Sequence, residues 1–181
     1  AALQAVQALA DDDYFSLIAF DHAPFIVMDL RRISQAKELA AQRTANLYPA
    51  GQTNLLPALS IADQKLRSIQ AMKKHIVLVS DETLATHGHE KYYLEEISNA
   101  KEAGITLSCF AIGQDGDFSL LKLIAESGKG SFYRVSNAPD LPQAVVNEIR
   151  KAVGKRPPKS LETQRAPISA TPVQSQQPSR G

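Results

Sequence analysis

The sequence has little of what several classes of protein require. Its 181 residues include one cysteine, Cys109, so no disulfide can form within the chain and a cysteine-only metal cluster is excluded. No apolar run reaches the length of about 18 residues that a membrane-spanning helix needs. The first residues do not have the pattern of a signal peptide. Because basic and aromatic residues form no common stripe, we expect no nucleic-acid binding.

Motifs of the common enzymes on α/β folds are missing too. The chain contains no GxGxxG or GxxxxGK[ST] loop for a nucleotide, and no GxSxG turn for a nucleophilic serine. Cys109 lies within the apolar run TLSCFAIG, which favours a small buried side chain over a nucleophile. We therefore expect no intrinsic enzyme activity.

Composition and charge divide the chain into two parts. Hydrophobic residues make up 44% and charged residues 22% of the sequence, values that are ordinary for a soluble globular protein. Residues 155–181 hold five prolines, five basic residues and one acid, so this stretch carries +4 and residues 1–154 carry −3 of the overall +1. The sequence predicts a folded domain over 1–154 and a proline-rich, disordered tail or linker over 155–181.

Short apolar runs alternate with helical patterns along the first 154 residues. Strands are predicted at 14–20, 25–28, 75–80, 105–113 and 131–135, and helices at 34–47, 53–70, 90–103, 118–127 and 139–153. This alternation predicts an α/β fold with a doubly wound, mainly parallel sheet and right-handed crossovers. The first two strands form a hairpin, which adds one antiparallel edge strand.

Two stretches of this pattern raise questions about the site and the fold. Residues 76–79 in HIVLVSDE are apolar without a break, which indicates a strand buried on both faces. Asp81 follows at the carboxyl end of that strand, where open α/β sheets place their ligands. The segment AALQAVQALA (1–10) is apolar nearly all round and predicts a buried helix. No strand precedes it, although a doubly wound sheet should have one there.

Several sequence segments, in the same order along the chain, resemble a von Willebrand factor type A domain. They are GQTNLLPAL (51–59), KHIVLVSDE (74–82), AKEAGITLSCFAIGQDGD (100–117) and LLKLIAESGKGSFYRVSNAPDLPQAV (120–145). These segments are most similar to such domains in large bacterial membrane-associated proteins, some of which also carry a glutamine-amidotransferase-like domain. The resemblance covers about residues 1–154 and implies a Rossmann-like fold, here truncated at its N-terminus and lacking the first central strand.

The resemblance also implies a metal-ion-dependent adhesion site, which this family builds from three loops. A DxSxS motif after the first strand, a threonine from a second loop and an aspartate after a later strand supply the ligands. The threonine matches Thr53 and the aspartate matches Asp81, while the chain has no DxSxS motif. Asn54 stands where an aspartate is frequent, and Glu82 stands where a glycine is usual, so both are possible contributors from neighbouring positions.

A hard divalent cation explains the chemistry of such a site. Mg²⁺, or Mn²⁺ or Ca²⁺ in its place, prefers oxygen ligands and leaves a coordination position for an acidic side chain of a partner. Thr53 and Asp81 alone would hold it weakly, so we expect no tight metal site in this chain as it stands. Each residue also has an alternative interpretation, because Thr53 suits a helix N-cap and Asp81 suits a turn.

The function implied by the resemblance is that of a protein–protein interaction module within a larger bacterial protein. In its intact form the module would bind a partner's acidic group through the cation. We expect the parent protein to be membrane-associated through other parts, while this segment itself inserts into no membrane. The alternative is a metal-independent scaffold of the same fold with a degenerate site, for which Asn54 and Glu82 count as support.

Overall fold

The computed structural model describes residues 1–44, 54–81, 90–114 and 118–154. In these ranges it contains the helices and strands that the sequence predicts, with ends that differ by a few residues. The elements are α1 (Ala2–Ala8), β1 (Tyr14–Phe20), β2 (Pro24–Arg32), α2 (Ile33–Thr44), α3 (Leu55–Arg67), β3 (Lys74–Ser80), α4 (Glu90–Glu102), β4 (Ile105–Ile112), α5 (Ser119–Ser127), β5 (Lys129–Val135), the short 3₁₀ helix η1 (Ala138–Asp140) and α6 (Leu141–Val153). The predicted tail over 155–181 lies outside the described residues, so that boundary stays a prediction.

The strands form two sheets in the described part of the chain. β3, β4 and β5 make a parallel sheet in that order, with Leu78 opposite Cys109 and Phe110 opposite Tyr133. β1 and β2 make a separate antiparallel hairpin, in which Ile18 lies opposite Ile26. The mixture of parallel strands and one antiparallel hairpin follows the prediction, but no strand pairing joins β1 to β3 within the described ranges.

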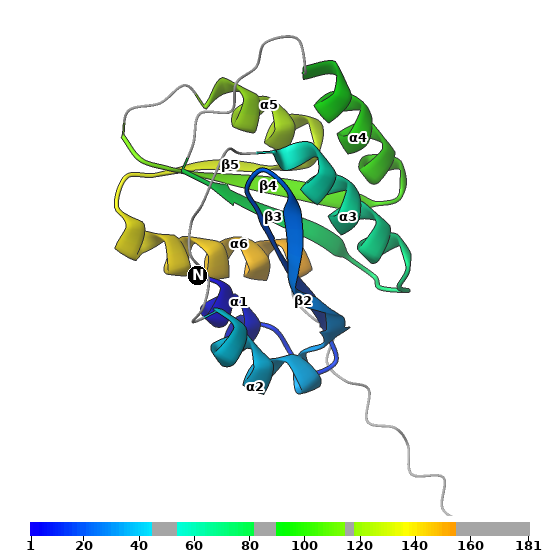
Figure 1. The fold of residues 1–181 in the computed structure, drawn as a ribbon, viewed down its shortest axis with the longest axis vertical. Coiled ribbons are helices and arrows are strands. Elements are labelled where there is room, and N and C mark those ends of the chain that lie inside the picture. Colours follow the sequence, from blue (N-terminus) through cyan, green and yellow to red (C-terminus); the bar gives the residue numbers. More distant parts are fainter. Residues whose placement is uncertain (45–53, 82–89, 115–117, 155–181) are drawn as a thin grey trace, which may run out of the picture.

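Helices cover both faces of the parallel sheet (Figure 1). α3, α4 and α5 lie on one face, and α6 lies on the other, next to α1. Alternation along β4 explains this division, because Leu107, Cys109 and Ala111 point to the first face while Phe110 points to the second. Helices on both faces of a parallel sheet are the arrangement of a doubly wound α/β fold.

Three groups of buried side chains hold the layers together. The largest lies between the parallel sheet and α3–α5, and Phe20 of β1 packs against it. A second joins α6 and α1 to the other face of the sheet through Ala5, Phe110 and Ile149. The third fills the space between the hairpin, α1 and α2 and consists of Val6, Met28, Ile33, Ala36 and Ala40. The hairpin is therefore attached to the sheet through side chains.

β3 is less buried than its sequence indicates. Only Leu78 and Ser80 are buried, whereas the apolar side chains of Ile76, Val77 and Val79 are partly exposed. β4, the central strand, is buried along most of its length. The difference has a simple cause, because β3 pairs with β4 on one edge and has no strand on the other among the described residues. An apolar run predicts a strand but does not show how many neighbours cover it.

The first helix is buried on one side rather than all round. Ala5 and Val6 face the interior, with exposed fractions of 4% and 1%. Leu3 is 38% exposed, and Gln4 and Gln7 are exposed as well. The prediction of a wholly buried helix was therefore wrong. α1 packs against α2 and α6, and these contacts bury only the side chains that face those two helices.

Candidate functional site at the carboxyl edge of the sheet

Asp81 and Asn54 lie at the same edge of the fold. Asp81 is exposed and directly follows β3. α3 leads into β3 through residues 68–73, so the helix runs back along the strand and begins at the edge where the strand ends. Asn54, also exposed, occupies the position just before α3. The carboxyl end of a parallel strand thus meets the amino end of a helix, which is the usual place for a ligand in this fold class.

The two other predicted residues of the site, Thr53 and Glu82, lie outside the described residues. The predicted pairing of Thr53 with Asp81 is therefore not tested and stays a prediction. The N-cap position of α3 belongs to Asn54, one residue later than the capping alternative placed it. Among the described residues the Asn54 side chain makes no capping hydrogen bond, so its amide oxygen does not cap the first turn of α3.

Asp21 is a residue of this edge that the sequence did not single out. It directly follows β1, and its backbone carbonyl accepts a hydrogen bond of 2.6 Å from the Asn54 backbone N–H. Its side-chain Oδ1 accepts a 3.0 Å bond from the Ala23 backbone N–H and lies 3.0 Å from Nδ1 of His22. The carboxylate closes the hairpin turn, while the carbonyl fixes the start of α3. Asp21 could have been found from the sequence, because it follows a predicted strand directly, as Asp81 does.

Arg134 lies at the other end of the same edge and contacts the segment between β4 and α5. Its Nε donates to the Gly113 carbonyl at 3.4 Å, and its Nη2 donates to the Gln114 carbonyl. The guanidinium carbon also lies 5.3 Å from the centre of the Phe118 ring. These contacts tie β5 to the segment between β4 and α5. The exposed carboxylate of Asp81 and this guanidinium give the edge groups of both signs.

The described side chains at this edge offer the type of ligand atom that a hard cation prefers, but too few of them to complete its coordination. The Asp81 carboxylate and the Asn54 amide offer oxygen atoms of the type that Mg²⁺ and Ca²⁺ prefer. Two side chains fill only part of a six-coordinate shell, so water, Thr53 and a partner would have to supply the rest. Within the described ranges, His, Cys, Asp and Glu side chains form no group of three suited to a metal ion.

Cys109 offers no second chemistry. The side chain is fully buried in β4, with 0% exposed, and burial raises the pKa of its thiol far above the ordinary value. A thiol that remains protonated and inaccessible is a poor nucleophile. The prediction that Cys109 acts as a small buried hydrophobic residue is therefore confirmed.

Comparison with known proteins identifies the fold. The family model of the von Willebrand factor type A domain matches residues 1–147. The chain belongs to this family. Type A domains are in general interaction modules rather than enzymes, and they can bind a divalent metal at the metal-ion-dependent adhesion site. The resemblance drawn from the sequence is confirmed, and with it the doubly wound α/β class.

Relatives agree on the fold but differ in size. The protein sll0103 of Synechocystis sp. (strain ATCC 27184 / PCC 6803 / Kazusa) is 27% identical over 138 residues, which span 76% of this chain and 32% of that protein. The chain thus spans about a third of the length of this relative. The von Willebrand factor type A protein from Catenulispora acidiphila is 20% identical, with a TM-score of 0.73 over 85% of this chain and 37% of that one.

Two further structures carry informative names. An aerotolerance-related membrane protein from Bacteroides fragilis NCTC 9343 is 17% identical, with a TM-score of 0.62 over 83% of this chain and 85% of that one. Proximal thread matrix protein 1 from the mussel byssus, with a zinc-occupied MIDAS motif, is 18% identical, with a TM-score of 0.61 over 80% and 37%. At these identities the likeness shows the fold alone. In the described part of this type A domain, no helix is both long and apolar enough to span a bilayer.

Proposed function

We propose that this type A domain is a protein-interaction module that, in its intact form, binds an acidic group of a protein partner through a divalent cation. Asp81 and Thr53 are the proposed metal ligands, and Asn54 and Glu82 are neighbouring contributors. The observation that carries the proposal is the exposed Asp81 at the carboxyl end of β3, beside the start of α3. The zinc-occupied motif of the mussel relative supports a metal function on this fold.

Some residues of this edge would bind the cation, and others would contact the acidic group of the partner. Bound there, the cation would supply a positive charge that attracts a carboxylate. Asp81 is exposed, so its oxygen atoms can reach the ion directly or through water. The amino end of α3 carries the positive end of the helix dipole, which favours anionic groups nearby. The Asn54 amide makes no capping bond within the described residues, and it can hydrogen-bond a partner's carboxylate from the side.

The setting of the module is part of the same proposal. Residues 1–154 would form the interaction domain, and residues 155–181 would link it to other parts of a larger bacterial protein. The name of the aerotolerance-related relative supports a parent that is associated with a membrane. The Synechocystis relative, about three times as long as the matched region, supports a module within a longer protein.

Binding of Mn²⁺ to the full chain tests the proposal. Mn²⁺ is measured by the loss of its electron paramagnetic resonance signal on binding, in parallel with Mg²⁺ competition. We expect weak, saturable binding that falls about tenfold or more with Asp81→Asn, a change of about 1.4 kcal/mol or more in binding free energy. Thr53→Ala should give a similar loss, because it removes a hydroxyl ligand.

The control is Glu126→Gln, which makes the same change of carboxylate to amide on α5. The Glu126 side chain is 62% exposed and belongs to the carboxyl-terminal turn of its helix, away from the edge of Asp81. This variant should bind Mn²⁺ as the parent chain does. Equal binding by the Asp81→Asn and Glu126→Gln variants would contradict the proposed ligands. No saturable Mn²⁺ binding at all would favour the metal-independent scaffold.

A further inference from the structure

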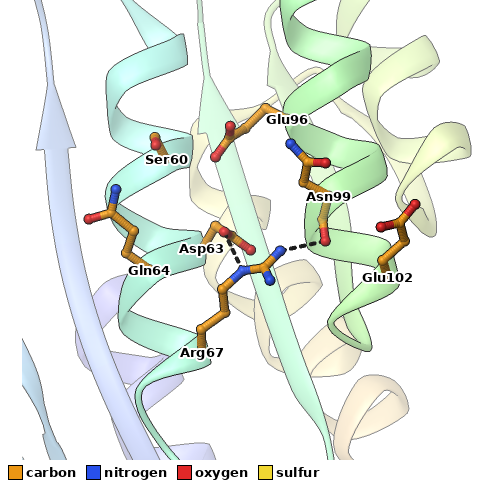
Figure 2. Close-up of a pocket in the computed structure, with 7 residues that line it drawn as sticks. All are labelled: Ser60, Asp63, Gln64, Arg67, Glu96, Asn99 and Glu102. Carbon is orange, nitrogen blue, oxygen red and sulfur yellow. Dashed lines mark hydrogen bonds and ion pairs between the residues drawn. The ribbon is translucent and has the colours of Figure 1, made fainter.

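A polar groove lies between α3 and α4. Both helices are on the face of the parallel sheet that also carries α5 (Figure 1). The groove encloses about 310 Å³. Figure 2 shows Asp63 and Arg67 of α3, and Glu96 and Asn99 of α4, turned toward the space between the two helices. The lining residues are Ser60, Asp63, Gln64 and Arg67 of α3 and Glu96, Asn99 and Glu102 of α4. Three carboxylates against one guanidinium leave this lining with a net formal charge of −2.

The Arg67 side chain crosses the groove and donates hydrogen bonds to some of the acceptors that line it. Its Nε donates a 2.6 Å hydrogen bond to Oδ2 of Asp63, and its Nη2 donates a 2.5 Å bond to the Asn99 carbonyl across the groove (Figure 2). The hydrogen bond to Asp63 is the main reason that the pKa of Arg67 is raised, and the charges of Glu96 and Glu102 act in the same direction. The guanidinium thus lies in a negative field that it does not neutralise.

Asp63 presents an oxygen atom without a partner. The residue is buried, with 7% exposed, and it projects from α3 between the two helices (Figure 2). Among the described residues Oδ1 has no hydrogen-bond partner, although Oδ2 of the same carboxylate is bonded to Arg67. Leaving a buried acceptor unsatisfied costs about 1–3 kcal/mol, and more for a charged group. A ligand that brings a hydrogen-bond donor and a positive charge would remove this cost.

The form of the groove favours an organic cation over a metal ion. Its carboxylates do not form a compact ligand group among the described residues, as a metal ion would require. They are spread along α4 from Glu96 to Glu102, with Asp63 on the opposite wall. A guanidinium or ammonium group on a flexible stem can reach separated acceptors, since it carries up to five donors.

We propose that the groove between α3 and α4 is a docking site for a basic side chain, arginine or lysine, of a protein partner. Arg67 lies in the last turn of α3, just before the connection to β3, so this groove belongs to the opposite end of the strand from Asp81. A partner could therefore engage the groove without covering the proposed cation site. The inference does not depend on metal binding, and it is tested with a chelator present.

The test is a titration of the ¹⁵N-labelled full chain, in EDTA, with a blocked Gly-Arg-Gly-Arg-Gly peptide, followed by amide chemical shifts. We expect saturable shifts in α3 and α4, with a dissociation constant on the order of 1 mM for so short a probe. Glu96→Gln should weaken binding at least about fivefold, and the double variant with Glu102→Gln should weaken it further. The affinity should also fall as salt is added, because the contact is between charges.

Glu95→Gln is the matched control, since Glu95 is an exposed neighbour on α4 that does not line the groove. It should leave the affinity unchanged. A Gly-Lys-Gly-Lys-Gly peptide compares the two basic side chains, and spermidine tests whether any polycation suffices. Equal losses in the Glu95 and Glu96 variants, spermidine binding as tight as the peptide, or no saturable shift, as expected if only water fills the groove, would each overturn the proposal.

Discussion

Ser108 of β4 donates a 2.6 Å hydrogen bond to the carboxylate of Glu148 of α6, and both residues are buried. The Tyr133 hydroxyl donates to the other carboxylate oxygen at 2.5 Å. The Ser108 hydroxyl oxygen also accepts a 2.9 Å bond from the backbone N–H of Ser131. One carboxylate therefore joins α6 to two strands of the sheet. A buried charge is tolerated only where donors surround it in this way.

Removing one of these donors should destabilise the fold. Ser108→Ala leaves the buried Glu148 carboxylate with one hydrogen bond fewer, and we expect the free energy of unfolding to fall by about 1.5–3 kcal/mol. Urea denaturation followed by circular dichroism measures the change. Ser34→Ala, at an exposed position of α2, is the control and should alter stability by no more than about 0.5 kcal/mol. A similar loss in both variants would show that the network contributes nothing specific.

His75 makes the stability of the domain depend on pH. Its Nδ1 lies 2.6 Å from the Thr106 hydroxyl. Its Nε2 is buried 3.8 Å from Oε1 of Glu148 and has no hydrogen-bond partner in the part of the chain that the structure describes. Burial lowers the pKa of His75 and Lys151 adds to this effect, while Glu148 opposes it. Because the folded pKa is depressed, the unfolded chain binds the proton more readily. Stability should be full above the unfolded pKa of about 6.5 and fall as the pH drops below it.

Measurement of unfolding free energies between neutral and mildly acidic pH checks this dependence. His75→Gln removes the titrating ring, so the part of the slope that it causes should disappear. The control is His22→Gln, because the His22 side chain is 77% exposed. It should leave the slope as it is in the parent chain. An unchanged slope with His75→Gln would exclude this histidine as the cause.

Much of the fold could be read from the sequence, because periodicity and turn residues act locally. The run over 76–79 predicted β3, and the helical pattern over 90–103 predicted α4. The burial of β3 and of α1 could not be read in this way. Burial depends on which elements pack on each side, and Leu3 in α1 has the same apolar character as Val6 although only Val6 is buried.

The candidate site was predictable in part, for a related reason. Asp81 follows a strand, and its place at the edge of the sheet is set by that strand alone. Asp63 and Glu148 gave no comparable signal, since both are single acids within amphipathic helices. Glu148 matters through Ser108, 40 positions away, and the groove beside Asp63 exists because Arg67 meets Asn99, 32 positions away. Such long-range pairs become visible only when the helices are placed in space.

The free edge of β3 should promote association. β3 pairs with β4 alone in the described residues, and its apolar side chains are partly exposed. Unpaired N–H and C=O groups along such a strand can pair with a second chain, which native edge strands avoid with charges or bulges. We expect sedimentation velocity to show larger species as the protein concentration rises. A single monomeric species over about a hundredfold range of concentration would contradict this expectation.

Gly130 is the position where the sheet leaves no room for a side chain. A Cβ atom there would lie less than 3.0 Å from the Leu107 carbonyl and from the Ser108 hydroxyl oxygen, a distance that Cβ contacts in proteins essentially never show. The pairing of β4 with β5 is irregular at this point, between Leu107 and Cys109, and the backbone of Lys129 has φ 55°. A strand glycine at a bulge is typical of such a close approach. Gly130→Ala should therefore force β5 away from β4.

We expect Gly130→Ala to lower the free energy of unfolding by about 1–3 kcal/mol or more, as overpacking does elsewhere. Gly104 provides the comparison, because a Cβ there meets no atom of the described residues within 4 Å but the backbone has φ 75°. Gly104→Ala should cost about 1–2 kcal/mol through its left-handed backbone, and Gly104→Asn should cost less. Gly130→Asn should not recover stability in this way, since its obstacle is the Leu107 carbonyl. Urea denaturation of the four variants distinguishes the two causes, and an equal recovery by asparagine at both positions would refute the steric explanation.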